Sequence, residues 1–168
     1  RLAADGFGIL TFGDDAEPVI ERLQTALGAP GEDTGWATGD AGGRTCVGSN
    51  RHLIWVIQPA DEGEAHPAVL YVHFGEDETG AQSFTEYAYL SLDPQAVDAG
   101  AMDLSTEAGI TIGRTIAEFV AAYGQPEFQD GTSGMAEAGG MLMGIAQSGG
   151  EDLVWFVGAG EDGCEWYE

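Results

Sequence analysis

Gly8-Ile-Leu-Thr-Phe-Gly13 returns later in the chain as Gly109-Ile-Thr-Ile-Gly113, and Leu53-Ile-Trp-Val-Ile57 returns as Leu153-Val-Trp-Phe-Val157. The offset from Gly13 to Gly113, and again from Leu53 to Leu153, is 100 residues. Two distinct segments that recur at one offset are hard to obtain by chance and indicate a repeated structural unit. We therefore predict two tandem copies of one α+β unit.

We predict one helix in each copy, between Gly13 and Gly28 in the first and between Gly113 and Gly124 in the second. Apolar residues recur at helical spacing in both stretches, and a proline stands two residues after each closing glycine. Thr115-Ile-Ala-Glu118 is a capping box, and Asp14-Asp-Ala-Glu17 offers a carboxylate cap at the matching place. Start and stop signals therefore agree for both helices. The apolar positions are Ala16, Val19, Ile20, Leu23 and Leu27 in the first helix and Ile116, Phe119, Val120 and Tyr123 in the second.

The sequence after each helix predicts an antiparallel meander of strands. The expected strands span residues 44–48, 52–58, 68–74 and 83–92 in the first copy and 141–146 and 152–158 in the second. The polar stretch 93–106 is the expected boundary. We thus divide the chain into a first helix-plus-sheet repeat, residues 1–96, and a second, shorter one, residues 97–168. Each repeat is a capped helix packed on an antiparallel meander, and the two sheets can join into one concave surface.

The residues around the second helix carry a family resemblance. Gly113-Arg-Thr115-Ile-Ala-Glu118-Phe119, followed by Gly124-Gln-Pro126, resembles the tandem-repeat fold of the beta-lactamase inhibitory protein family and its relatives in the outer-membrane-assembly lipoprotein superfamily. The first copy departs from this pattern, because Asp15 stands where the family has threonine. The resemblance implies helices packed on antiparallel sheets and binding of another protein outside the cytoplasm without catalysis.

The charge of the chain is extreme. It has 29 acidic residues against five arginines, which gives a formal net charge of −24. Such a polyanion repels nucleic acid and anionic membrane surfaces, and it attracts basic proteins or divalent cations. Two explanations of the acidity stay open. It can attract a basic partner, or it can reflect the composition of a GC-rich genome such as an actinobacterium's, which also explains the lack of lysine, and simply keep the protein soluble. The sequence contains no transmembrane span and no signal peptide. Residues 1–8 are typical of the start of a mature segment, so an exported protein whose leader has been removed is compatible with this sequence.

Two cysteines, Cys46 and Cys164, allow one intramolecular pairing. The repeat alignment places Cys46 in the first strand of the first sheet and Cys164 after the Trp155 strand, so a disulfide would tie the two repeats together. In an exported protein we expect this disulfide, and in a cytosolic protein two free thiols. Neither cysteine has a second cysteine or a histidine at metal-ligand spacing, so we expect no metal site.

Catalytic and cofactor signatures are missing from the sequence. It contains no nucleophile elbow, phosphate-binding loop or His-Glu-x-x-His motif, and we expect no cofactor. His73 beside Glu76 or Asp77 would suit a small hydrolase, which is the alternative from a different class. The acidic turns at residues 61–64, 76–78 and 161–162 would suit a calcium-dependent structural domain of the cell envelope, although none has the standard calcium loop.

Aromatic residues alternate with aliphatic ones along three predicted strands. If the aliphatic set faces the helices, the aromatic set faces outward and forms a protein-binding surface. The alternative is that these aromatics are structural, because aromatic residues favour strands and such a face can be covered. The predicted contact residues are Trp55, Tyr71, His73, Tyr87, Tyr89 and Trp155.

These observations predict an extracytoplasmic binding module that is not an enzyme. Its partner would be another protein, either a basic one or an extracellular enzyme that it inhibits, and not nucleic acid. Inhibition itself does not follow from the fold.

Overall fold

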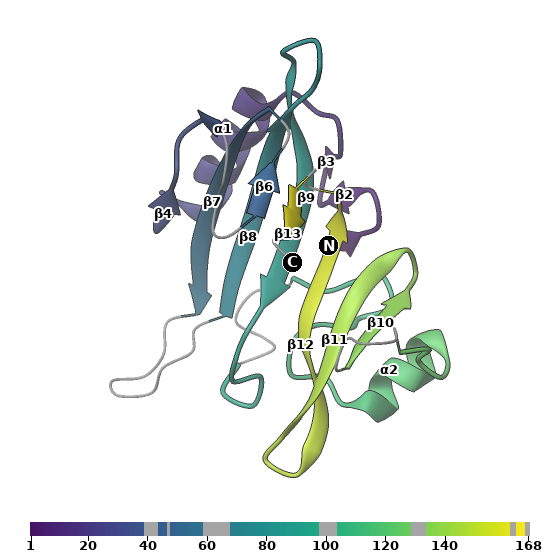
Figure 1. The fold of residues 1–168 in the computed structure, drawn as a ribbon. Coiled ribbons are helices and arrows are strands. Elements are labelled where there is room, and N and C mark those ends of the chain that lie inside the picture. Colours follow the sequence, from purple (N-terminus) through teal and green to yellow (C-terminus); the bar gives the residue numbers. More distant parts are fainter. Residues whose placement is uncertain are drawn as a thin grey trace.

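We describe the fold from a computed structural model (Figure 1). It describes residues 1–38, 44–46, 48–58, 68–97, 104–128, 134–161 and 164–166. Residues 44–46, 58 and 164–166 are described by their backbone alone.

An antiparallel eight-stranded sheet forms the centre of the molecule. The strands run in the order β10 (Met135–Ala138), β11 (Met141–Ser148), β12 (Glu151–Gly160), β9 (Gln82–Leu90), β8 (Ala68–Glu76), β7 (Ser49–Gln58) and β4 (Glu32–Asp33). Strand β5 (Ala37–Thr38) also pairs with β7. Sequential antiparallel pairing is thus confirmed for β7–β9 and for β11–β12, and with the two helices the chain has a mixed α+β fold. The first expected strand, 44–48, does not join this meander, because its described part, Arg44–Cys46, pairs with Cys164–Trp166 in a separate sheet.

Two helices pack on one face of this sheet. Helix α1 (Ala16–Leu27) contacts β9, and α2 (Ile116–Tyr123) contacts β12. The predicted apolar stripe of α1 is buried at Ala16, Val19, Ile20 and Leu23, and α2 buries Phe119. These side chains join one hydrophobic cluster with the sheet, so a single core lies between the helices and the sheet.

The two helices begin differently. At α2 the capping box is present, because the Thr115 hydroxyl accepts from the Glu118 amide and Glu118 Oε2 accepts from the Thr115 amide at 2.9 Å. At α1 the predicted carboxylate cap is wrong, since Asp15 holds the cap position without a side-chain hydrogen bond. The neighbouring Asp14 is engaged in the preceding turn, where its Oδ2 accepts from the Thr11 amide at 2.9 Å.

The segments that enter the helices are bound to the sheet in the same way. The Gly13 amide donates to the Phe84 carbonyl, and the Phe84 amide donates to Asp14, each at 2.9 Å. The Gly113 amide donates to Val154 at 2.9 Å, and the Val154 amide donates to Arg114 at 2.8 Å. Each helix entrance therefore exchanges two hydrogen bonds with one strand, β9 for α1 and β12 for α2.

This pairing corrects one part of the sequence alignment. Leu53–Ile57 lies in β7, whereas Leu153–Val157 lies in β12. Strand β12 pairs with β9 near the middle of the sheet, while β7 pairs with β8 and the short edge strand β4. The two tryptophan segments thus occupy different places, and the strand that matches β12 by its helix contact is β9.

Two small sheets, which the sequence did not predict as such, complete the fold. Strands β1 (Leu2–Ala3), β2 (Gly6–Phe7) and β3 (Leu10–Thr11) form one, and Leu2 is buried beside Thr106. Strands β6 (Arg44–Cys46) and β13 (Cys164–Trp166) form the other, drawn in Figure 1 in front of β8 and β9, on the side of the sheet away from α1.

The pairing of β9 with β12 makes one continuous sheet of strands from residues 1–96 and 97–168. In the part of the chain that the structure describes, neither helix has the length and hydropathy needed to cross a membrane.

Candidate functional site

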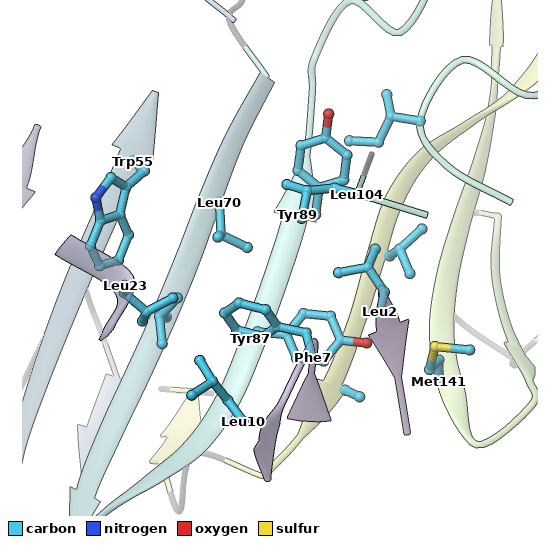
Figure 2. Close-up of a cluster of buried hydrophobic side chains, with 14 of the residues drawn as sticks. Leu2, Phe7, Leu10, Leu23, Trp55, Leu70, Tyr87, Tyr89, Leu104 and Met141 are labelled. Atoms are coloured by element: carbon cyan, nitrogen blue, oxygen red, sulfur yellow. The ribbon is translucent and has the colours of Figure 1, made fainter. Parts of the chain in front are cut away.

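The face of the sheet that carries the helices is buried beneath them. Across the strands, neighbouring positions on this face form a row that we call the inner row: Trp55, Leu70, Tyr89, Val157, Met143 and Ala136. All six side chains are buried. Figure 2 shows Trp55, Leu70 and Tyr89 together with Leu23 of α1 and with Tyr87, the next residue along β9 on this face.

This observation corrects the predicted aromatic surface. Trp55, Tyr87 and Tyr89 are at most 3% exposed and belong to the core. Their polar atoms are directed into it as well: the Trp55 indole N–H donates to the Gly28 carbonyl at 2.9 Å, and the Tyr87 hydroxyl donates to the Ala3 carbonyl at 2.8 Å. Burial raises the pKa of both tyrosine hydroxyls above its usual range. These three residues cannot form a contact surface in this structure.

Strand register explains why the prediction placed them outside. Trp55 and Tyr89 both lie opposite Leu70, so they share the face of Leu70 and not that of its neighbour Tyr71. In β9 an irregularity at Thr85 brings Phe84 to the same face as Tyr87, although the two are three residues apart. Simple alternation cannot reveal either relation.

The opposite face carries a second row, which we call the outer row: Val56, Val69, Leu90, Phe156, Gly144 and Met135. It crosses the sheet from β7 to β10 and contains no charged side chain. Val56 is 51% exposed, and Val69, Leu90, Phe156 and Met135 are half-buried. A parallel row follows it, with Ile54, Tyr71, Ala88, Gly158, Leu142 and Glu137.

Two predicted contact residues do lie on this outer face, Tyr71 and Trp155, and both are half-buried. A register irregularity at Trp155 places its indole against Gly144, where an added Cβ would lie 2.6 Å from the ring. The ring of Phe156 covers Gly158 in the same way, at 2.7 Å from an added Cβ. The two rings are 5.6 Å apart. The glycines thus allow two large aromatic rings to lie flat on the sheet.

The part of the outer face around His52 and His73 is polar and buried. The Tyr71 hydroxyl and His52 Nδ1 share a hydrogen bond at 2.6 Å, and His73 Nδ1 lies 2.8 Å from Thr85 Oγ1. The two histidine rings are 4.6 Å apart. His73, the remaining predicted contact residue, is 0% exposed. It is therefore on the predicted face but is not accessible.

Of the two carboxylates proposed for His73, Asp77 is engaged in its own turn, and Glu76 lies opposite Gln82 at the end of β8. Glu86 lies directly opposite His73 on β9. Asp77 stabilises its own turn, because its Oδ1 accepts from the amides of Thr79 and Ala81 at 2.8 and 3.0 Å. The Thr79 hydroxyl also donates a hydrogen bond to Asp77 Oδ1, and this bond, together with those from the two amides, lowers the pKa of the Asp77 carboxyl. This turn is a hydrogen-bonded hairpin tip.

An ion-pair cluster fastens α1 to the sheet on the inner side. Arg51 of β7 donates to Asp33 of β4 at 2.7 and 2.9 Å and to Glu17 of α1 at 3.2 Å. The Arg51 hydrogen bond lowers the pKa of the Asp33 carboxyl.

Several expectations fall on parts that the structure leaves undescribed. The acidic turn at residues 61–64 and Asp162 of the turn at residues 161–162 lie outside the described residues. The side chains of Cys46 and Cys164 do too, but their backbones stand directly opposite each other in the β6–β13 pair. The disulfide stays a prediction. Among the described residues, no group of three histidine, cysteine or acidic residues could hold a metal ion.

The residues of the outer row that the sequence analysis missed are Val56, Val69, Leu90, Phe156 and Met135. One signal was present: Gly144 and Gly158 interrupt otherwise apolar strands, which is typical of a site where a large group lies against the backbone.

Comparison of the chain with protein-family models, curated proteins and solved structures finds no match. The family resemblance of the second helix stays a prediction from its residues.

Proposed function

We propose that this chain is a non-catalytic protein-binding module whose contact surface is the outer row, with Tyr71 and Trp155 beside it. The observation that carries the proposal is the uncharged row from Val56 to Met135 on the sheet face away from the helices, in which Val56 is exposed and most of the other side chains are half-buried. Aromatic and aliphatic side chains that lie together on a rigid sheet are typical of protein contact surfaces.

The occupant that suits this surface is a protein with an apolar loop surrounded by basic side chains. The apolar loop would cover the outer row, while the net charge of −24 would attract the basic surroundings and accelerate the encounter. Arg51 and Arg114, two of the five arginines, already pair with carboxylates of this chain. The net charge of −24 already includes these arginines.

A repeated architecture is part of the same proposal. The matching hydrogen bonds at Gly13 and Gly113 fit two related units, α1 with β7–β9 and α2 with β10–β12, joined at β9 and β12. In this arrangement the outer row crosses both units, so one partner would contact both. The extracytoplasmic location belongs to this proposal. It is supported by the resemblance and by the backbones of Cys46 and Cys164, which lie directly opposite each other, as a disulfide of an exported protein requires.

The test begins with capture from the culture medium and envelope of the source organism on the immobilised protein. The captured protein is identified and purified, and its affinity is measured for the wild type and for Val56→Ser/Phe156→Ala. Because hot-spot side chains carry most of the binding energy, we expect the double substitution to weaken binding at least tenfold. The association rate should also fall as salt is raised.

The matched control is Ile9→Ser. Ile9 is an apolar residue with 81% exposure in the loop between β2 and β3, and its substitution removes exposed apolar area away from the outer row. It should leave binding unchanged. A captured partner whose affinity is insensitive to Val56→Ser/Phe156→Ala, with both variants folded, would contradict the outer row as the contact surface.

A further inference from the structure

We propose that a cavity between α1 and the β2–β3 hairpin binds a small monocarboxylic acid with an aliphatic chain, with Arg22 pairing its carboxylate. This site lies on the helix side of the sheet and is independent of the outer row.

The cavity is small and apolar. Its volume is about 220 Å³, which is below the usual range for drug-sized ligands. Phe7 and Leu10 line it from the hairpin, Leu23 and Leu27 from α1, and Leu70 from β8. Figure 2 shows four of these five residues around the same part of the core. An occupant would thus be a short, slender hydrocarbon.

Arg22 is the charged residue of this apolar lining, and it is exposed to solvent. In the described part of the chain, Arg51 and Arg114 bind carboxylates and Arg1 contacts the Glu107 carbonyl, but Arg22 has no such partner. The residues three and four positions away on its helix are uncharged, so no neighbour on α1 competes for it. The chain has 29 acidic residues, yet Arg22 pairs with none of those that the structure describes. An unpaired arginine beside an apolar cavity is suited to bind the carboxylate of a ligand.

The exposed wall of the cavity supports the same ligand. Ile9 is 81% exposed and also lines the cavity, so an aliphatic occupant would cover part of an isoleucine that otherwise faces water. The net negative charge of the chain opposes anions at long range, but salt screens this repulsion beyond about 8 Å. At contact distance the guanidinium can donate two parallel hydrogen bonds to a carboxylate.

The test measures binding of hexanoate, octanoate and decanoate, and of 1-octanol, by isothermal titration calorimetry. We expect binding to tighten about fourfold for each added methylene until the cavity is full. Arg22→Gln should weaken octanoate binding about tenfold or more and leave octanol binding within about twofold. Ala26→Phe, at an exposed lining position, should fill the cavity and weaken both ligands.

Arg114→Gln is the control, since this arginine lies on the other half of the molecule and pairs with Glu118. It should bind like the wild type. Absence of saturable octanoate binding to the folded wild type would overturn the proposal, as would binding that Ala26→Phe leaves unchanged. Equal loss of octanoate and octanol in Arg22→Gln would overturn the role of Arg22. Partner capture through the outer row is unaffected by each of these outcomes.

Discussion

The two faces of the eight-stranded sheet use aromatic residues in opposite ways. On the inner face, Trp55, Tyr87 and Tyr89 are buried beneath the helices, and two of them donate hydrogen bonds inside the molecule. On the outer face, Trp155 and Phe156 lie flat over glycines and stay half-buried. The residue type is the same, but strand register and two glycines decide whether an aromatic ring supports the core or remains accessible.

The largest expected effect concerns the β6–β13 pair, which Figure 1 draws on the outer side of the sheet. Cys46 and Cys164 are opposite each other there, and a disulfide between them would close a very long loop. Reduction, or the double substitution Cys46→Ser/Cys164→Ser, should lower the free energy of unfolding by on the order of 4–5 kcal/mol. Urea unfolding with and without reductant measures this.

Mass spectrometry of the non-reduced protein provides the check. A mass lower by two hydrogens than that of the reduced chain shows the bond, and the cysteine-free variant should not respond to reductant. Two free thiols in protein that was purified under oxidising conditions would contradict the prediction.

The next effect compares the faces directly. Tyr87 is fully buried, and its ring lies 5.4 Å from that of Phe7. Tyr87→Ala should lower the free energy of unfolding by about 3–5 kcal/mol because it leaves a cavity. Phe156→Ala, on the outer face, should cost less than half as much, because its ring is already partly in water. Equal losses in urea unfolding would mean that both faces are core.

A smaller effect tests the glycines of the outer face. Gly158→Ala would place a Cβ 2.7 Å from the Phe156 ring and 3.0 Å from the Tyr87 carbonyl oxygen, so the ring must move off the sheet. We expect a loss of about 1–3 kcal/mol from this crowding. If the crowding is responsible, Gly158→Ala/Phe156→Ala should lose less than the sum of the two single variants. Additive losses would show that the Phe156 ring and Gly158 do not interact.

Much of the fold could be predicted from the sequence, because its signals are local. Apolar residues at helical spacing, with glycine and proline at the ends, predicted both helices, and β-rich runs predicted the six strands β6, β7, β8, β9, β11 and β12. The capping box at Thr115 was also predicted, since both of its partners lie within one turn.

The face of each aromatic could not be predicted in this way. It depends on which residues oppose each other across strands: Trp55 opposite Leu70, and a one-residue irregularity at Thr85. The carboxylate cap of the first helix was wrong for a related reason. The Asp14 carboxylate accepts from the Thr11 amide in the preceding turn, a contact that the helix signal does not reveal. The short strands β1, β2 and β3 carry two residues each, too few for a periodic signal.

The smallest expected effect concerns how the helices of the inner face begin. Thr115→Ala removes a hydroxyl that accepts from the Glu118 amide and should cost about 1 kcal/mol. Asp15→Ala removes no cap hydrogen bond and should cost only about 0.3–0.5 kcal/mol, from the lost carboxylate near the helix N-terminus.

The pH dependence separates the two caps. The Thr115 amide holds the pKa of the Glu118 carboxyl below its usual range. A lowered pKa in the folded state adds stability that is complete above the ordinary pKa and is lost as the pH falls through the lowered one. Glu118→Gln should therefore destabilise the protein at pH 7, and its difference from wild type should shrink below about pH 4. Urea unfolding at pH 7 and pH 3 measures the change. A constant difference would mean that the charge of Glu118 does not contribute to this cap, and the two helix starts would then differ only by a hydroxyl.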